Sequence, residues 1–123
     1  MKKQILVTGG CGFIGSHTVV ELILSGYQVI VIDDLSNSNA SVIDKIQCIT
    51  GERPEFHQVD ICNRDALTNL FKQYAFDAVM HFAALKNPQE SYHLKEKYFL
   101  TNVEGTRRLL AVMDDFSVNL LIF

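Results

Sequence analysis

The sequence is poor in the residues that mark disulfide-stabilised and metal-binding proteins. It contains 3 cysteines and 4 histidines in 123 residues, and it has no tryptophan. Cys11, Cys48 and Cys62 are odd in number and form no Cys-x-x-Cys pair, so we expect reduced thiols of the kind that cytoplasmic proteins carry. The histidines are scattered without a His-x-x-x-His or Cys/His cluster, which predicts that the chain has no metal site.

Long apolar runs and clusters of basic residues are also absent. No segment approaches the roughly 18 apolar residues that a membrane span needs, and the apolar run after Lys3 is too short for a signal peptide. The net charge is −3 without an arginine cluster, which argues against nucleic acid as a partner. With 48% hydrophobic and 20% charged residues, the chain is typical of one soluble globular domain, which we expect in the cytoplasm.

Short apolar runs alternate along the chain with longer segments of helical pattern. Strands are expected over residues 4–8, 28–32, 56–59, 78–82 and 119–123. Helices are expected over residues 13–24, 41–49, from a cap at Asn63 or Asp65 to 74, and over 88–116 with an irregularity near Thr101 and Asn102. Because each strand is nearly all apolar, both faces of the sheet must be covered. The pattern therefore predicts βαβ units and a parallel sheet of the α/β class.

A glycine pattern separates the first expected strand from the first expected helix. Gly9, Gly12 and Gly15 stand three residues apart in this connection. In dinucleotide-binding folds one glycine permits a tight turn, one lets the backbone approach a pyrophosphate, and one lets the helix pack against the strand. The helix amino terminus then offers free N–H groups and a positive dipole end to the phosphates. The alternative interpretation is a glycine-rich turn that serves packing alone.

Two carboxylates follow the second expected strand. Asp33 stands where a carboxylate accepts both hydroxyls of an adenosine ribose, and a 2′-phosphate there would be repelled by Asp33 and Asp34 together. The pair therefore favours NAD over NADP. A cap within the loop is the alternative for Asp33, and it is the preferred interpretation for Asp34.

Further candidates follow the third and fourth expected strands. Ligands of open α/β sheets bind outside the carboxyl ends of the strands, which is where Asp60, Ile61 and residues 82–86 are expected. Lys86 has a solvated surface lysine as its alternative. His81 lies within an apolar strand, so we interpret it as a hydrogen-bonded core histidine and not as a catalytic one.

Three stretches carry a family resemblance: residues 7–38, the HFAALK segment at 81–86 and NVEGTRRLL at 102–110. Together they resemble the UDP-glucose 4-epimerases, NAD-dependent epimerases of the extended short-chain dehydrogenase/reductase family. The resemblance extends from about residue 4 to the last residue. It implies a Rossmann-type doubly wound parallel sheet with NAD as cofactor and a UDP-sugar as substrate of the full-length relatives.

The resemblance also implies a place for each candidate around NAD. Phe13 and Ile14 would lie along the pyrophosphate, and Asp60 and Ile61 would flank the adenine. The adenosine ribose would be surrounded by Asp33, Asp34, Leu35, Ser36, Asn37 and Ser38. The nicotinamide side would be lined by Phe82, Ala83, Ala84, Leu85 and Lys86, with Lys86 also near the sugar nucleotide and Thr101 or Asn102 facing the same cleft.

The chain departs from the family pattern at Asp34, where asparagine is usual, at Ala84, where glycine is usual, and at residues 87–89, where smaller residues are usual. Such enzymes carry a Ser/Thr after the fifth strand and then a Tyr-x-x-x-Lys pair whose tyrosine is the general base. None of the 4 tyrosines here precedes a lysine at that spacing. The resemblance therefore implies that residues 1–123 are the amino-terminal part of the NAD-binding domain, inactive alone because the catalytic and substrate-binding portion is absent. The alternatives are a non-catalytic dinucleotide-binding module and a fragment of a related sugar-nucleotide dehydratase or reductase.

The expected strand order is 3-2-1-4-5, which leaves residues 119–123 as an apolar edge. An unpaired edge is a template for another chain. We therefore expect self-association through this edge or through the helix over 88–116, with which the resembled enzymes dimerise.

Overall fold

Five parallel strands form one sheet at the centre of the molecule. The computed structural model describes residues 2–36, 38–83 and 100–122. The strands are β1 (Gln4–Thr8), β2 (Gln28–Asp33), β3 (Glu55–Gln58), β4 (Ala78–His81) and β5 (Leu121–Ile122). They pair in the order β3-β2-β1-β4-β5, and every pairing is parallel. The predicted fold class and strand order are therefore confirmed.

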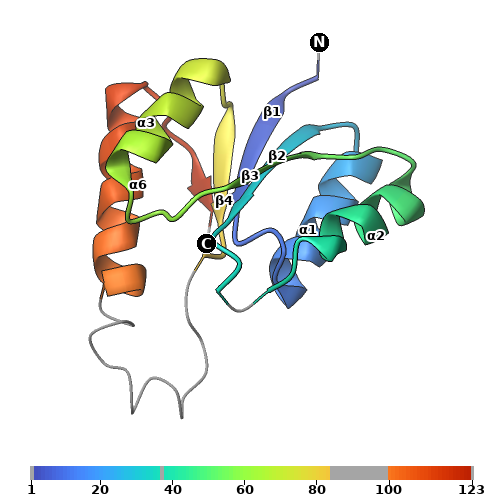
Figure 1. Cartoon of the computed structure of the whole chain (residues 1–123). Coiled ribbons are helices and arrows are strands. Elements are labelled where there is room, and N and C mark those ends of the chain that lie inside the picture. Colours follow the sequence, from blue (N-terminus) through green and yellow to red (C-terminus); the bar gives the residue numbers. More distant parts are fainter. Residues whose placement is uncertain (1, 37, 84–99, 123) are drawn as a thin grey trace.

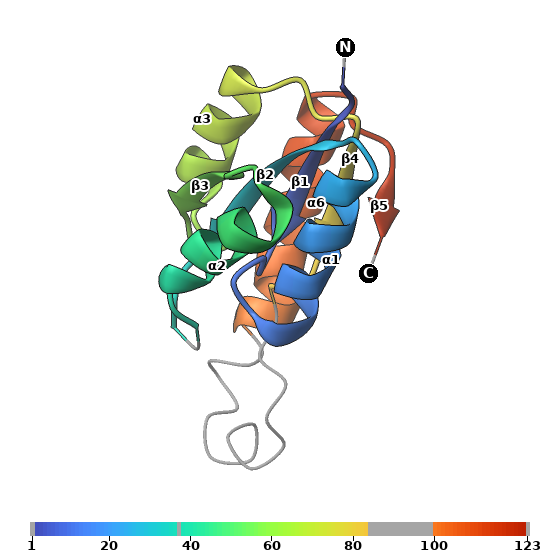
Figure 2. The same cartoon turned by 90° about the vertical axis from the view of Figure 1, so that its right-hand side faces the viewer.

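Helices cover both faces of the sheet. Figure 1 shows α1 (Phe13–Leu24) and α2 (Ser41–Thr50) on one face, and α3 (Arg64–Gln73) and α6 (Gly105–Asp115) on the other. Figure 2 looks onto the face that α1 and α2 cover. The helix predicted over 88–116 is described only from residue 100, where a π-helical turn, η1 (Leu100–Glu104), precedes α6. This turn confirms the predicted irregularity, and the earlier part of that helix lies outside the described residues.

Alternating side chains of the central strands build one apolar core on each face. In β1, Leu6 packs toward α3 and α6, whereas Ile5 and Val7 pack toward α1 and α2. The alternation follows from the strand period of two, and it explains why the central strands are apolar on both sides. Leu6 and Val7 are fully buried, so β1 anchors both cores.

The ends of the elements follow local chemistry. Asn63, one of the two predicted caps, accepts a hydrogen bond from the Ala66 amide at 3.1 Å and so begins α3. Gly51, with φ of +80°, ends α2 in the left-handed region that glycine adopts at little cost. Among the described residues the fifth strand comprises Leu121 and Ile122, which pair with β4, and begins later than predicted. Among the described residues β5 has no second neighbour to extend its ladder.

Replacing Leu6 tests the role of β1 as the shared anchor. Leu6→Ala removes a fully buried side chain and should lower the free energy of unfolding by about 2–5 kcal/mol. Leu24→Ala changes a side chain that is 61% exposed and should stay within about 0.5 kcal/mol. Urea denaturation of both variants measures the difference, and equal losses would contradict the assignment of the core.

Candidate functional site

The loop between β1 and α1 passes close to the end of β4, and Gly9 makes this approach possible. Its backbone has φ of +69°, and a Cβ atom there would lie 2.6 Å from the carbonyl carbon of Phe82 and 2.7 Å from the amide nitrogen of Ala83. The Gly9 amide donates to the carbonyl of Ile32 at 2.8 Å, which also ties the loop to β2. The loop is therefore fixed to both neighbours of β1, and Gly9 is the glycine of the tight turn.

The other two glycines of the pattern differ in what surrounds them. A Cβ atom at Gly15 would collide with the carbonyl of Gly9, so Gly15 lets α1 pack against the loop. At Gly12 the nearest neighbour of such an atom would be the Gly9 carbonyl oxygen at 3.4 Å. None of the described residues therefore crowds Gly12, which suits the predicted role of leaving space for a ligand.

The amino terminus of α1 has no side-chain cap of its own. Gly12 occupies its cap position without a side-chain hydrogen bond, and the first turn holds no acidic residue. Phe13 is 81% exposed and Ile14 is half exposed at the same end. Backbone N–H groups and the positive end of the helix dipole therefore remain available to an external anion such as a phosphate.

The carboxylate of Asp33 holds two loops together at the end of β2. Asp33 is 7% exposed, and its Oδ2 accepts the Cys11 amide at 3.1 Å. Its Oδ1 accepts the Leu35 amide and the Ser38 hydroxyl, both at 2.8 Å. Leu35 has φ of +63°, a strained conformation that the bond to Asp33 helps to maintain. A carboxylate has about four acceptor positions, so Asp33 caps the loop and still has acceptor capacity for a ribose hydroxyl.

Cys11 belongs to the site through its backbone and not through its thiol. Its side chain is buried beside Asp33, and burial, followed by the charge of that carboxylate, raises the pKa of the Cys11 thiol to about 12. The thiol is therefore neutral and the backbone amide supports Asp33. Sequence reasoning overlooked Cys11, although its position inside the glycine pattern was the available signal.

Asp34 and its neighbours form a separate local turn. The exposed Asp34 accepts the Ser36 amide at 3.0 Å and the Ser36 hydroxyl at 2.8 Å through the same oxygen. This contact corresponds to the preferred interpretation of Asp34 as a loop residue. Its charge nevertheless stands next to that of Asp33 at the carboxyl end of β2. Asn37 lies outside the described residues.

Asp60 and Ile61 follow β3 and differ in orientation. Asp60 is exposed and accepts the Cys62 amide at 2.8 Å. Ile61 is 3% exposed, and its side chain contacts Gly105 of α6, so its backbone and not its side chain is available to a ligand. Burial, followed by the charge and hydrogen bond of Asp60, raises the pKa of the Cys62 thiol.

The end of β4 completes the described part of the site. Phe82 and Ala83 are half-buried, and their amides donate to the side-chain hydroxyl of Thr8 at 3.1 and 3.2 Å. Asn102 is half-buried in η1, which leads directly into α6. Ala84, Leu85 and Lys86 lie outside the described residues, as does the side chain of Thr101.

The histidine of β4 is a hydrogen-bonded core residue, as predicted. His81 is 6% exposed, and both ring nitrogens contact threonine hydroxyls, Nδ1 at 2.6 Å from Thr8 and Nε2 at 2.9 Å from Thr106. Thr8 and Thr106 were not predicted as part of this arrangement, because the pairing of distant segments is not visible in the sequence.

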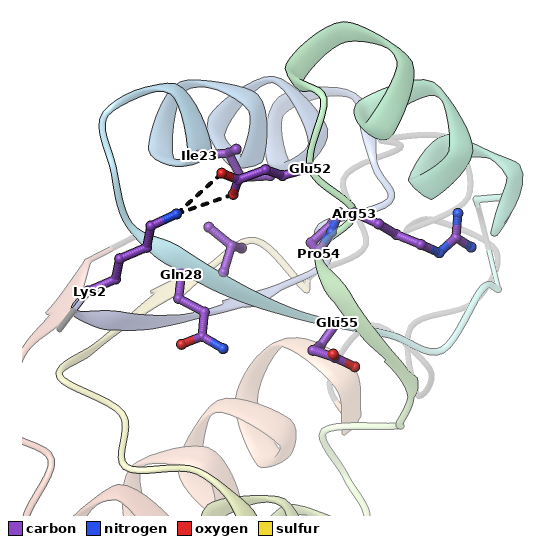
Figure 3. Close-up of a pocket in the computed structure, with 8 residues that line it drawn as sticks. Lys2, Ile23, Gln28, Glu52, Arg53, Pro54 and Glu55 are labelled. Carbon is purple, nitrogen blue, oxygen red and sulfur yellow. Dashed lines mark hydrogen bonds and ion pairs between the residues drawn. The ribbon is translucent and has the colours of Figure 1, made fainter.

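Two surface cavities lie at the opposite end of the sheet. One, of about 380 Å³, is lined by residues at the amino ends of β1, β2 and β3, including Lys2, Gln28 and Glu55. Figure 3 shows Lys2 crossing toward Glu52, with which it forms an exposed ion pair at 3.2 Å. The second, of about 590 Å³, lies at the carboxyl ends of α3 and α6. Neither involves the glycine loop.

Residues 2–36, 38–83 and 100–122 contain neither a metal-binding cluster nor a membrane-spanning helix. No group of three or more His, Cys, Asp or Glu side chains is placed there to hold a metal ion. Among the same residues no helix has the length and apolar character to cross a membrane.

Comparison with known proteins gives one consistent family. A model of the NAD dependent epimerase/dehydratase family matches residues 5–123. The UDP-glucose 4-epimerase of Dictyostelium discoideum is 48% identical over 120 residues, which are 98% of this chain and 35% of that protein. The enzyme of the same name from Bacillus subtilis is 43% identical over 119 residues, or 97% of this chain and 35% of that protein. The chain thus spans about a third of the length of these relatives.

Solved structures agree with this result. The UDP-glucose-4-epimerase of Stenotrophomonas maltophila, with bound NAD and formylated UDP-arabinopyranose, is 47% identical with a TM-score of 0.94 over 97% of this chain and 35% of that one. The enzyme of Bifidobacterium longum, in complex with NAD+ and UDP, is 36% identical with a TM-score of 0.96 over 98% of this chain and 36% of that one.

Two glycines with positive φ allow the cost of backbone strain to be distinguished from the cost of a steric clash. Gly51→Ala places a side chain at φ of +80° with no atom within 4 Å and should cost about 1 kcal/mol from backbone strain alone. Gly9→Ala, at φ of +69°, also meets the backbone of Phe82 and Ala83 and should cost a further ~1–3 kcal/mol. Thermal unfolding measures both, and equal effects would show that the close approach does not constrain the loop.

Proposed function

The chain belongs to the NAD dependent epimerase/dehydratase family, and from this membership and the geometry of the glycine loop we propose that it binds the adenosine and pyrophosphate half of NAD. It does so as part of a UDP-glucose 4-epimerase, which interconverts UDP-glucose and UDP-galactose in galactose metabolism in the cytoplasm. The observation that carries the proposal is the combination of an uncapped α1 amino terminus at Gly12 with the fixed carboxylate of Asp33.

The pyrophosphate is bound by backbone groups. Gly12 is the one glycine of the pattern that the described residues do not crowd, and it stands at the amino terminus of α1. A phosphate at this point receives N–H donors and the positive end of the helix dipole without competing with an acidic side chain. Phe13 and Ile14 are exposed and lie alongside it.

The adenosine ribose is selected by charge. The remaining acceptor capacity of Asp33 takes a ribose hydroxyl, whereas a 2′-phosphate would be brought next to the carboxylates of Asp33 and Asp34. Residues 33–38 surround the ribose, with Asn37 among them, and the backbone of Asp60 and Ile61 flanks the adenine. The preference for NAD over NADP follows from this repulsion.

We assign the nicotinamide half to residues 82–86, Thr101 and Asn102. Lys86 is also assigned to the vicinity of the UDP-sugar. When bound, NAD accepts a hydride from the sugar and returns it. The residues of this chain bind and orient the cofactor for that exchange, and no Tyr-x-x-x-Lys pair is present among them to supply a general base. We expect no epimerase turnover from these 123 residues by themselves.

Calorimetric titration tests the proposed half-site. NAD and ADP-ribose should bind with similar affinity, because the adenosine and pyrophosphate contacts dominate, and NADP should bind more weakly. Asp33→Asn should weaken NAD binding about tenfold, since hydrogen bonds to a charged group are lost. Asp44→Asn is the matched control and should leave the affinity unchanged. It alters the exposed ion pair that Asp44 of α2 forms with Arg53. Equal binding of NAD and NADP, or epimerase activity of a pure sample, would contradict the proposal.

Self-association through β5 is proposed as well. Among the described residues this strand pairs only with β4, and its Ile122 and the preceding Leu120 are exposed. Such an edge pairs readily with another chain, and a charge placed on it opposes pairing. Light scattering at high micromolar concentration should show a species larger than a monomer, and Ile122→Lys should shift it toward the monomer. A monomeric wild-type chain would exclude this association.

A further inference from the structure

A buried threonine and histidine stand side by side directly beneath the proposed site. Thr8 of β1 and His81 of β4 are partners in the parallel register. By strand alternation both share the face of Leu6 and Val79, which packs against α3 and α6. Each immediately precedes a residue of the close approach, because Gly9 follows Thr8 and Phe82 follows His81.

The hydrogen bonds of Thr106 indicate which nitrogen of the His81 ring carries a hydrogen atom. The Thr106 hydroxyl donates its proton to the carbonyl of Asn102 at 3.0 Å, the back-bond that threonine makes within a helix. The same oxygen lies 2.9 Å from His81 Nε2, so it accepts a proton from that nitrogen. Nε2 therefore carries hydrogen, and Thr106 joins the ring to η1.

The hydrogen bonds of the Thr8 hydroxyl indicate the role of the other ring nitrogen, Nδ1. The Thr8 hydroxyl oxygen accepts the Ala83 amide at 3.2 Å and shares the Phe82 amide with the Thr8 carbonyl, which that amide reaches at 2.9 Å. It lies 2.6 Å from His81 Nδ1, and its own proton is the one available for that contact. Nδ1 is therefore an acceptor, and the ring is the neutral tautomer with hydrogen on Nε2.

We propose that His81 is a positioning residue for the dinucleotide site. Its neutral ring connects the carboxyl ends of β1 and β4, through Thr8 and Thr106, to the π-helical turn that holds Asn102. The glycine loop lies against the backbone of Phe82 and Ala83, whose amides end on the same Thr8 hydroxyl. One chain of hydrogen bonds thus sets the distance between the pyrophosphate loop and the turn assigned to the nicotinamide side. This role rests on the proposed function of the site.

The first test is the tautomer, which does not depend on NAD. Nitrogen-15 NMR of the wild-type imidazoles should give His81 a protonated Nε2 and an unprotonated Nδ1 at neutral pH. Hydrogen on Nδ1, or on both nitrogens, would overturn the inference.

The second test removes one hydroxyl at nearly constant volume. Thr106→Val removes the hydroxyl that lies 2.9 Å from His81 Nε2, and we expect about tenfold weaker NAD binding, with Thr106→Ser restoring it. Thr50→Val is the control, because it removes a hydroxyl that makes the same kind of back-bond, to the Ile46 carbonyl at 2.8 Å, at the carboxyl end of α2 and away from the site. Wild-type affinity in Thr106→Val would overturn the inference.

Amide hydrogen exchange separates failure of the inference from failure of the proposed function. Thr106→Val should accelerate exchange at Gly9 and Gly12, whose amides bond to Ile32 and Gly9, and leave Gly51 unchanged. If the wild-type chain binds no NAD, the proposed function fails, and unchanged exchange at Gly9 and Gly12 then overturns the positioning role independently.

Discussion

The arrangement of the site depends on the close approach of Gly9 to the backbone of Phe82 and Ala83. No side chain fits there, since a Cβ atom would lie 2.6 Å from the Phe82 carbonyl carbon. The approach places the start of α1 at the carboxyl end of the sheet, next to the end of β4. Gly15 extends the same constraint, because it allows the first turn of α1 to rest on the Gly9 carbonyl.

The charges at this end of the sheet determine which parts of a ligand can bind at each point. The uncapped amino terminus of α1 attracts an anion, while Asp33 at the end of the neighbouring strand repels one and accepts hydroxyl groups. A ligand that carries a phosphate near a sugar hydroxyl can place the phosphate at the α1 amino terminus and the hydroxyl at the Asp33 carboxylate. The two apolar cores hold these groups in place, because β1 and β2 are buried on both faces. The cavities at the opposite end of the sheet offer no such combination.

Much of this arrangement could be predicted from the sequence because it depends on local patterns. The apolar runs predicted the strands, the glycine spacing predicted the loop, and Asn63 could be named as one of two caps. The bonds of Asp33 to Cys11 and Leu35 could not be predicted, since they depend on how two loops meet in space. The Thr8, His81 and Thr106 contacts join segments far apart in the chain for the same reason. The inward orientation of Ile61 was also not visible, because the packing of Gly105 decides it.

We propose that NAD binds at the carboxyl ends of the strands, over the glycine loop. Mapping amide chemical-shift changes on addition of NAD tests it most directly, because every described amide reports its own location. Binding there should give the largest changes at Gly12, Phe13, Ile14 and the loop after Asp33, with little change at Lys2 or Glu52. Changes concentrated around Lys2, Glu52 and Glu55, at the opposite end of the sheet, would contradict it.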